Sequence, residues 1–450
     1  MHENMCGSEE NMQRRKKVRM ERTHLFLPDA VVVMKAEIYP DQRKIRELSA
    51  KKENRNALLA QIREAIMQAS MANETLHSRL VMDAHGEVWY EAMKEPGTIC
   101  EVCAENTDWK LLAATQKKQP FDLEKGKLMR CFLIPQKDGI TIVVMMHHLA
   151  GDGKSGITFL EDVMSALNQK TLTDKPLTVL QQSDFPRRTG LRLLVRRLIW
   201  SLNHAWKREG TVFDRQDYLR VCDGYWKQQE QKIADRIFTE KETEQIRQMA
   251  KQEGVTVHTF LTTAVLKAYG RQAEVSYAVD VCGTARNGMG NFVSGQNFTA
   301  AYDDTDSFAG NMKQIHAIYQ EKKLDVRNRY FTLRFLGALT PALIDCAAVQ
   351  TYTDYDSEVG RTIAHLLGYD ARQDGVSISN LTGFHLSGEG DGYRMRDLLF
   401  VPPMIPYDSR LFGIVTLENR LGLTLHYREG EIDGERLLDQ VAWAVRAGSS

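Results

Sequence analysis

The spacing of apolar positions in the first part of the chain predicts alternating strands and helices. Residues 30–34 form a short apolar run that is typical of a buried strand, whereas apolar positions between 58 and 67 recur at helical spacing. The stretches 77–82 and 87–92 have strand-like patterns and flank a turn that contains glycine, which predicts a β-hairpin. This part of the chain therefore has the pattern of a mixed α/β region.

A second hairpin is predicted just before a histidine-containing loop. Residues 128–134 and 140–146 flank a polar turn, and the second strand is apolar on both faces, as expected at the centre of a sheet. Beyond the loop at 147–153, apolar positions up to residue 167 have helical spacing, and Ser155 is placed to cap that helix. The loop thus connects a buried strand to an amphipathic helix.

The pattern changes between residues 170 and 230, where strand periodicity disappears and arginines alternate with Leu, Ile and Trp. A second α/β series follows, and its first helix opens with the capping-box spacing of Thr239 and Glu242. The later elements are predicted as a helix at 257–269, strands at 413–417 and 421–427, and a helix that starts near Asp433.

Length and composition support an α/β protein with two lobes. The chain has 450 residues, more than one hydrophobic core usually organises, and it is 43% hydrophobic and 26% charged. Its 59 basic residues equal its 59 acidic ones, which gives no reason to expect a nucleic-acid partner. We therefore expect a mobile leader at 1–22, an N-terminal lobe at 23–180, a basic linker helix region at 181–230 and a C-terminal lobe at 231–450.

Cysteine usage and hydropathy indicate a cytoplasmic protein. The seven cysteines are an odd number, no signal sequence precedes them, and no run approaches the roughly 18 apolar residues of a spanning helix. The segment 191–206 mixes arginine with Leu, Ile and Trp, so it fits either peripheral contact with an anionic membrane or a linker helix across the lobes. The pair Cys100-x-x-Cys103 has no partner pair at ligand spacing, and we expect no bound metal.

The candidate chemistry lies in the loop His147-His148-Leu149-Ala150-Gly151-Asp152-Gly153. Acyl transfer to a hydroxyl or an amine needs a base beside the attacking atom, and imidazole, with an ordinary pKa of about 6.5, is available in its neutral form. His148 is the candidate general base, whereas His147 is expected to be a packing residue. The two glycines allow backbone and substrate to approach closely.

Asp152 allows two interpretations. A carboxylate four residues after His148 could orient the base as the third member of a triad, or it could anchor the loop. We favour the anchor, because Arg130 lies opposite Val144 in the expected hairpin register, at the same end of the sheet as the loop. A charge-assisted pair between Arg130 and Asp152 would then fix the ring of His148, and Gly153 would keep the passage beside the base free of side-chain bulk.

The loop matches the His-His-x-x-x-Asp-Gly signature, and the chain resembles the chloramphenicol acetyltransferase-like superfamily, which includes nonribosomal-peptide condensation domains, alcohol acetyltransferases, polyketide-associated acyltransferases and wax ester synthases. Phe121-Asp122-Leu123 with Gly126 and Arg130 is similar to the segment before the signature in condensation domains, where the arginine pairs with the signature aspartate. The resemblance covers roughly residues 25 to 450. Two further segments carry it: Gly283-Thr284-Ala285-Arg286-Asn287 with Gly290-Asn291-Phe292-Val293, similar to the second-lobe core, and Ser379-Asn380-Leu381, similar to a motif near the tunnel.

This resemblance implies two chloramphenicol-acetyltransferase-like lobes in a V around a central tunnel, in which donor and acceptor reach His148 from opposite faces. It also implies a thioester donor, either acyl-CoA or a carrier-protein phosphopantetheine, and no metal or bound cofactor. Two departures leave the subfamily and the acceptor open. Lys154 stands where many condensation domains have tryptophan, and Phe412-Gly413 is only a fragment of the Asp-Phe-Gly-Trp-Gly segment of plant acyltransferases.

Three functions fit these residues. The first is a free-standing acyltransferase that forms an ester from acyl-CoA, with His148 as base, Ser379 or loop amides on the oxyanion and Asn380 nearby. The second is a condensation domain that forms amide bonds, with a carrier protein in trans because the residues after the last predicted helix leave no room for a carrier. The third is a non-catalytic relative that binds a carrier or a lipid. A covalent acyl-enzyme is not expected, because nothing in the signature supplies an activated serine or cysteine.

Overall fold

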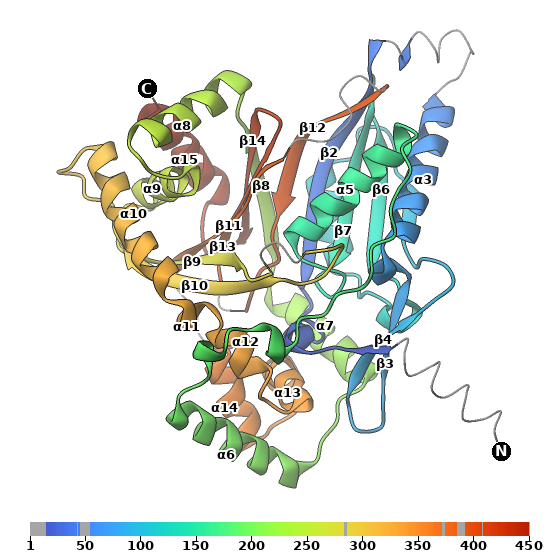
Figure 1. Cartoon of the computed structure of the whole chain (residues 1–450), viewed down its shortest axis with the longest axis vertical. Helices are drawn as coiled ribbons and strands as arrows, with labels where there is room; N and C mark the ends of the chain where they lie inside the picture. Colours follow the sequence, from blue (N-terminus) through green and yellow to red (C-terminus); the bar gives the residue numbers. More distant parts are fainter. Residues whose placement is uncertain are drawn as a thin grey trace.

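The computed structural model describes residues 15–42, 44–45, 55–282, 286–370, 374–384, 392–406 and 408–449. Within these ranges the chain forms two lobes, each built on its own β-sheet, with a group of helices beneath them (Figure 1). The α/β class and the two lobes expected from the sequence are confirmed.

The N-terminal lobe contains a five-stranded sheet in the order β12 (Tyr393–Val401), β2 (Val31–Pro40), β7 (Ile140–His147), β6 (Met129–Pro135) and β5 (Ile99–Val102). β5 runs parallel to β6, and the other neighbouring pairs are antiparallel. β7 lies at the centre of the sheet and every one of its residues is buried, which explains why its sequence is apolar on both faces. The predicted hairpin of residues 128–134 and 140–146 is confirmed.

One strand of this sheet comes from the C-terminal half of the chain. β12 pairs antiparallel with β2 at the edge of the N-terminal sheet, far from its neighbours in the sequence. The part expected as a C-terminal lobe at 231–450 thus contributes a strand to the other lobe. Such a long-range pairing has no signature in local residue spacing.

A small sheet, in the order β1 (Arg15–Lys17), β4 (Val88–Ala92) and β3 (Ser78–Met82), confirms the first predicted hairpin. The expectation of a mobile leader up to residue 22 is wrong for its described part. β1 pairs with β4, and the 3-10 helix η1 (Met20–His24) buries Met20, Glu21 and Arg22. The leader's residues 1–14 lie outside the described ranges.

The C-terminal lobe contains a six-stranded sheet in the order β10 (Val293–Ala300), β9 (Ala273–Asp280), β11 (Gly375–Phe384), β13 (Arg410–Leu417), β14 (Arg420–Arg428) and β8 (Gln231–Ile237). β11 runs parallel to both of its neighbours, and the remaining pairs are antiparallel. The strands predicted at 413–417 and 421–427 are confirmed as β13 and β14.

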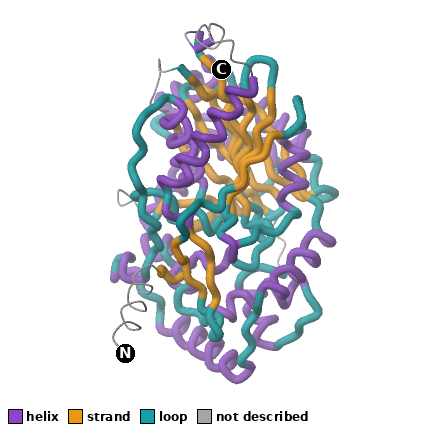
Figure 2. Tube along the Cα trace, turned by 90° about the vertical axis from the view of Figure 1, so that its right-hand side faces the viewer, coloured by secondary structure: helices purple, strands orange, loops and turns teal. Residues whose placement is uncertain are grey.

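Helices cover the outer faces of both sheets and fill the region beneath them (Figure 1). Figure 2 shows the same division from the side, with most strands in the upper part of the molecule and helices in the lower part. The 3-10 helices after η1 are η2 (Glu74–His77), η3 (Leu123–Lys125), η4 (Gln182–Asp184) and η5 (Arg187–Thr189). The α-helices are α3 (Arg55–Ala72), α4 (Trp109–Lys117), α5 (Gly153–Leu167), α6 (Leu193–Glu209), α7 (Arg215–Gln228), α8 (Glu240–Gln252), α9 (Val257–Tyr269), α10 (Phe308–Leu324), α11 (Val326–Arg329), α12 (Phe331–Leu336), α13 (Pro341–Tyr352), α14 (Glu358–Leu366) and α15 (Gly434–Gly448).

Local sequence signals explain where several helices begin. Thr239 and Glu242 form the predicted capping box at the start of α8, and Asp433 caps α15. The prediction that Ser155 caps α5 is wrong. Asp152 is the N-cap residue, because its carboxylate accepts the amide hydrogen of Ser155 three positions later.

The buried apolar residues form two large clusters. One surrounds the N-terminal sheet and extends into α7 and α13, and the other joins the C-terminal sheet to α8, α9 and α15. Val221 and Tyr225 of α7 are fully buried in the first cluster. Part of the region expected as a linker at 181–230 therefore belongs to a core.

Candidate active site

The loop between β7 and α5 is held by hydrogen bonds that its backbone amides donate. The amides of residues 148 to 152 donate, in order, to the Ala30 carbonyl at 2.7 Å, His147 Nδ1 at 3.2 Å, the His147 carbonyl at 2.8 Å, the His148 carbonyl at 3.2 Å and the Gly290 carbonyl at 3.2 Å. Because every one of these amides already has an acceptor, they are not available to stabilise an oxyanion. The expectation that loop amides stabilise the oxyanion is wrong for residues 148–152 and stays a prediction for the Gly153 amide.

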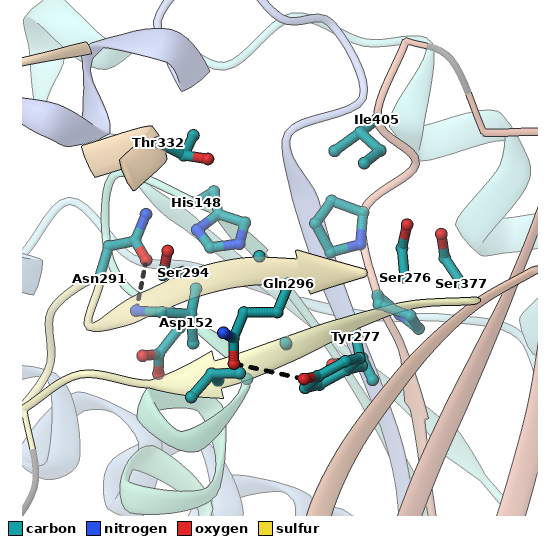
Figure 3. Close-up of a pocket in the computed structure, with 18 of the residues that line it drawn as sticks. His148, Asp152, Ser276, Tyr277, Asn291, Ser294, Gln296, Thr332, Ser377 and Ile405 are labelled. Atoms are coloured by element: carbon teal, nitrogen blue, oxygen red, sulfur yellow. Dashed lines mark hydrogen bonds between the residues drawn. The ribbon is translucent and has the colours of Figure 1, made fainter. Parts of the chain in front are cut away.

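His148 lies in the wall of a cavity between the lobes (Figure 3). Its side chain is largely buried, and its ring stacks on that of His24 with 4.1 Å between centroids and 7° between planes. Among the described residues, Nδ1 of His148 is buried without a hydrogen-bond partner. Burial lowers the pKa of His148, while Asp152 and its own backbone carbonyl raise it in part. The ring is therefore neutral at pH 7.

His147 has a different environment from that of His148. Its Nδ1 accepts the Leu149 amide, and its ring meets the edge of Phe121 with 5.5 Å between centroids. Burial, with smaller contributions from His148 and Arg130, lowers the pKa of His147 to about 3. These contacts are those of a packing residue, as the sequence predicts.

Asp152 anchors the loop to the other lobe. Its carboxylate is almost fully buried and receives both terminal nitrogens of Arg286, at 2.9 Å on Oδ1 and 2.7 Å on Oδ2. The Phe292 amide donates to Oδ2 at 3.0 Å, and the Ser155 amide donates to Oδ1 at 3.0 Å. A carboxylate so fully engaged is an anchor rather than a member of a proton relay.

The predicted pair of Arg130 with Asp152 is wrong. Arg130 lies opposite Met145 rather than Val144, and its guanidinium stands 4.1 Å from the ring of Phe121. Its nitrogens donate to the backbone carbonyls of Gln116, Gln119 and Pro120, at 3.0, 3.1 and 2.7 Å. The cause is the C-terminal end of α4 and the residues that follow it, whose carbonyls attract a cation. Arg286 forms the ion pair with Asp152 instead. The sequence indicated this arginine only as part of the segment that is similar to the second-lobe core.

The segment from 286 to 293 makes further contacts with the N-terminal lobe. Ser155 Oγ donates to the Gly290 carbonyl at 2.8 Å and accepts the Gly290 amide at 3.0 Å. Lys154 pairs with Asp280 at 2.7 Å. The base is therefore positioned by both lobes together.

Gly153 lines the cavity and packs closely against residues of β11 and β12. A Cβ at this position would lie 2.6 Å from Cδ2 of Leu381 and 3.0 Å from the ring of Phe400. The space beside the glycine is filled by these side chains, so the glycine permits close packing of β11 and β12 against the start of α5. That the glycine also keeps the passage beside His148 open stays a prediction.

The cavity has a volume of about 810 Å³ and is lined by both lobes. Ser379 and Asn380, the two supporting residues predicted near the tunnel, both line it. Opposite His148, β9, β10 and β11 contribute Ser276, Tyr277, Gln296 and Ser377 (Figure 3). We call these four residues the far wall.

The polar groups of the far wall bond to one another and to neighbouring residues, and Gln296 Nε2 also donates to the Lys322 carbonyl at 3.3 Å. Tyr277 donates from its hydroxyl to Gln296 Oε1 at 3.3 Å, and Ser377 Oγ donates to Asp408 Oδ1 at 2.8 Å. Burial raises the pKa of Asp408 to about 7, and its Oδ2 has no partner among the residues the structure describes. The wall thus offers hydroxyl, amide and carboxyl groups to a substrate.

Several of these residues were missed by sequence reasoning. His24 lies just after the expected leader, and the far wall sits on strands whose polar positions look like ordinary solvent-facing alternation. Only Arg286 had a usable signal, since it belongs to a segment already singled out. The neighbouring Gly283-Thr284-Ala285 lies outside the described residues.

Two other sequence features have no place in this site. No group of three or more His, Cys, Asp or Glu suited to a metal ion occurs within the described ranges. α6 buries Ile199, Leu202 and Trp206 but leaves Leu194 and Trp200 largely exposed, and peripheral membrane contact through it stays a prediction. Among the described helices, none is long and apolar enough to cross a membrane.

Comparisons with known proteins agree with this architecture. The family model for the condensation domain matches residues 52–292. A polyketide synthase-nonribosomal peptide synthetase of Aspergillus clavatus is 30% identical over 125 residues, which is 27% of this chain. The match spans only 3% of that much longer protein.

Solved structures share the fold at low sequence identity. The trichothecene 15-O-acetyltransferase of Fusarium sporotrichioides superposes with a TM-score of 0.60 at 10% identity, over 97% of this chain and 95% of its own. Polyketide synthase associated protein 5 of Mycobacterium tuberculosis gives 0.59 at 11% identity, over 97% and 99%. The epimerization domain from the third module of tyrocidine synthetase B gives 0.58 at 14% identity, over 97% and 96%.

Proposed function

The chain belongs to the condensation-domain family, and from this premise we propose that it transfers an acyl group from a thioester to a hydroxyl or an amine, with His148 as the general base. The observation that carries the proposal is a buried imidazole, with a pKa lowered by burial, in the wall of a cavity of about 810 Å³ that both lobes line. Because Nδ1 of His148 is buried, Nε2 is the nitrogen that serves as base.

The reaction has two steps in this proposal. Nε2 of His148 takes the proton of the acceptor as the acceptor oxygen or nitrogen forms a bond to the thioester carbonyl carbon. The resulting tetrahedral intermediate collapses, the carbon–sulfur bond breaks, and the departing thiolate takes the proton from the His148 imidazolium. The products are an ester or an amide and a free thiol, and the imidazole returns to its neutral form.

Ser379 is the proposed donor to the oxyanion of the intermediate. The amides of residues 148–152 are engaged elsewhere, whereas Ser379 lines the cavity on β11. A hydroxyl that rotates freely can follow the oxygen as its charge develops. Asn380, its neighbour, supports the same region of the cavity.

The donor is proposed to be acyl-CoA, and the acceptor an alcohol. The fold similarity to an O-acetyltransferase supports this choice. The alternative is a stand-alone condensation domain that forms amide bonds between carrier-bound substrates, which the family membership favours. A non-catalytic relative that binds a carrier or a lipid is the third possibility.

Release of free thiol tests the proposal and separates its alternatives. The protein is incubated with acetyl-CoA or longer acyl-CoAs, or with an acyl-loaded carrier protein, together with panels of alcohols and amines. Acceptor-dependent thiol release from acyl-CoA supports the first function, and release only from the carrier thioester supports the second. Donor binding without any thiol release contradicts catalysis and leaves the binding relative.

A further inference from the structure

His24 and His148 form a parallel stack at the cavity wall, although 123 positions separate them in the chain. Their centroids lie 4.1 Å apart, and their planes differ by 7°. Both rings line the cavity, and both have a buried Nδ1 without a partner in the described part of the chain. The base therefore presents one face to a second aromatic ring rather than to substrate.

Asn291 contacts the Nε2 atom of His24. Asn291 Nδ2 lies 2.9 Å from His24 Nε2, while its Oδ1 accepts the Val293 amide at 3.5 Å (Figure 3 labels Asn291 beside His148). This second bond orients the amide, so Nδ2 donates to Nε2 and the proton of His24 is on Nδ1. If His24 carried its proton on Nε2, two donors, Nε2–H and Nδ2–H of Asn291, would face each other without an acceptor. Burial, followed by the effects of His148 and His147, lowers the pKa of His24 well below its ordinary value.

Two separate anchors hold His24 in place. Arg22, two residues earlier in η1, forms a buried ion pair with Asp345 of α13, with Nε to Oδ1 at 2.9 Å. Asn291 belongs to the same short segment as Arg286, which holds Asp152. One segment of the C-terminal lobe thus fixes both the loop that carries the base and the ring stacked on it.

We propose that His24 is a positioning residue for His148: its neutral ring sets the plane of the base and faces the positive charge that His148 gains when it takes the acceptor's proton. The attraction between an imidazolium and the face of a neutral aromatic ring favours that charged intermediate. This inference rests on the proposed role of His148 as general base.

Other charged or titratable groups surround the pair. His147 precedes the base on β7, and Asp152 follows it at the start of α5 with Arg286 on its far side. Glu21 of η1 and Lys154 of α5 line the same cavity. Since each of these groups stays in place in a His24 variant, a change in His148 can be assigned to the stacked ring.

Two substitutions separate the ring from its nitrogens. His24→Phe keeps an aromatic face, whereas His24→Leu removes it at similar volume. In proteins labelled with ¹⁵N-histidine, NMR titration measures the pKa of His148, whose signal is assigned by its loss in His148→Gln. In His24→Leu we expect His148 to bind its proton about tenfold more weakly, so the pKa of His148 falls. In His24→Phe the proton affinity of His148 should stay within about threefold of that in the original protein.

The titration does not depend on turnover, so its failure differs from failure of the proposed function. Equal pKa values for His148 in all three proteins, or equal decreases in both variants, would overturn the stacking role. Where acyl transfer is measured, kcat should fall about tenfold in His24→Leu with KM unchanged, and His24→Phe should restore most of it. A fall in KM and kcat that is the same for both variants contradicts the proposal.

Discussion

The two sides of the cavity differ in how firmly their polar groups are held. On the side of His148, the base is stacked on His24 and its loop is tied through Asp152 to Arg286 and to the amides of Phe292 and Ser155. On the far wall, by contrast, Ser377 is bonded to a carboxyl that retains an unpartnered oxygen within the described structure. The first side is held by an ion pair and backbone amides from the other lobe, whereas the second carries neutral hydroxyl and amide groups that can exchange partners with a substrate.

We therefore expect the His148 side to determine the rate of the chemical step and the far wall to determine substrate recognition. Substitutions that loosen the His148 side should lower kcat and, where a buried charge loses its partner, stability. Substitutions on the far wall should change KM and substrate preference while the fold stays intact.

Among the substitutions that leave His148 itself in place, the largest effect is expected for Arg286→Ala. The variant leaves the buried carboxylate of Asp152 without its cation, which should lower the free energy of unfolding by about 3 kcal/mol and the transfer rate about 100-fold. Urea unfolding and initial rates measure the two quantities. Arg286→Lys keeps the charge but not the two parallel bonds and should lie in between. Unchanged stability and rate would show that Arg286 does not anchor the loop through Asp152.

The next largest effect is the loss of folding stability at low pH that protonation of His147 causes. Its pKa is about 3 in the folded chain and about 6.5 when unfolded, so its contribution to stability is complete above pH 6.5 and is lost as pH falls toward 3. His147→Asn cannot be protonated but can still accept the Leu149 amide. Between pH 7 and pH 5, the original protein should lose about 2 kcal/mol of unfolding free energy relative to this variant. Parallel stability curves would show that His147 is not buried as a neutral ring.

Arg130→Ala should have a moderate and different effect. The guanidinium satisfies carbonyls at the end of α4, so its loss should cost about 1–2 kcal/mol of stability. The transfer rate, corrected for the folded fraction, should stay within about threefold, because Asp152 keeps Arg286. A loss of activity as large as that of Arg286→Ala would restore Arg130 as the loop anchor.

The smallest effect belongs to the far wall. Tyr277→Phe removes one hydroxyl that bonds to Gln296, and KM should rise about threefold with kcat and melting temperature unchanged. Steady-state kinetics with a fixed donor check this. If kcat falls instead, the far wall takes part in the chemistry and the comparison fails.

The sequence predicted the elements around the base better than the contacts that orient it. The doubly apolar strand before His148 and the capping box at Thr239 follow local patterns, and the resemblance to the chloramphenicol acetyltransferase-like fold is confirmed. Local spacing also placed Arg130 beside the loop, but it could not show that the end of α4 lies closer.

Contacts between distant segments were beyond such reasoning. Arg286 reaches Asp152 across the two lobes, and His24 reaches His148 because β2, which follows His24 in the chain, pairs with β7. The pairing of segments more than a hundred residues apart depends on the whole fold, and a single sequence carries no periodicity that reports it.

The most direct test of the account compares His148→Gln with His147→Asn in the thiol-release assay, with an acceptor that the original protein uses. General-base catalysis predicts that kcat falls about 1,000-fold in His148→Gln, with donor binding and melting temperature retained, while His147→Asn stays within about tenfold at pH 7.5. Transfer by His148→Gln at a rate close to that of the original protein would contradict the assignment of the base.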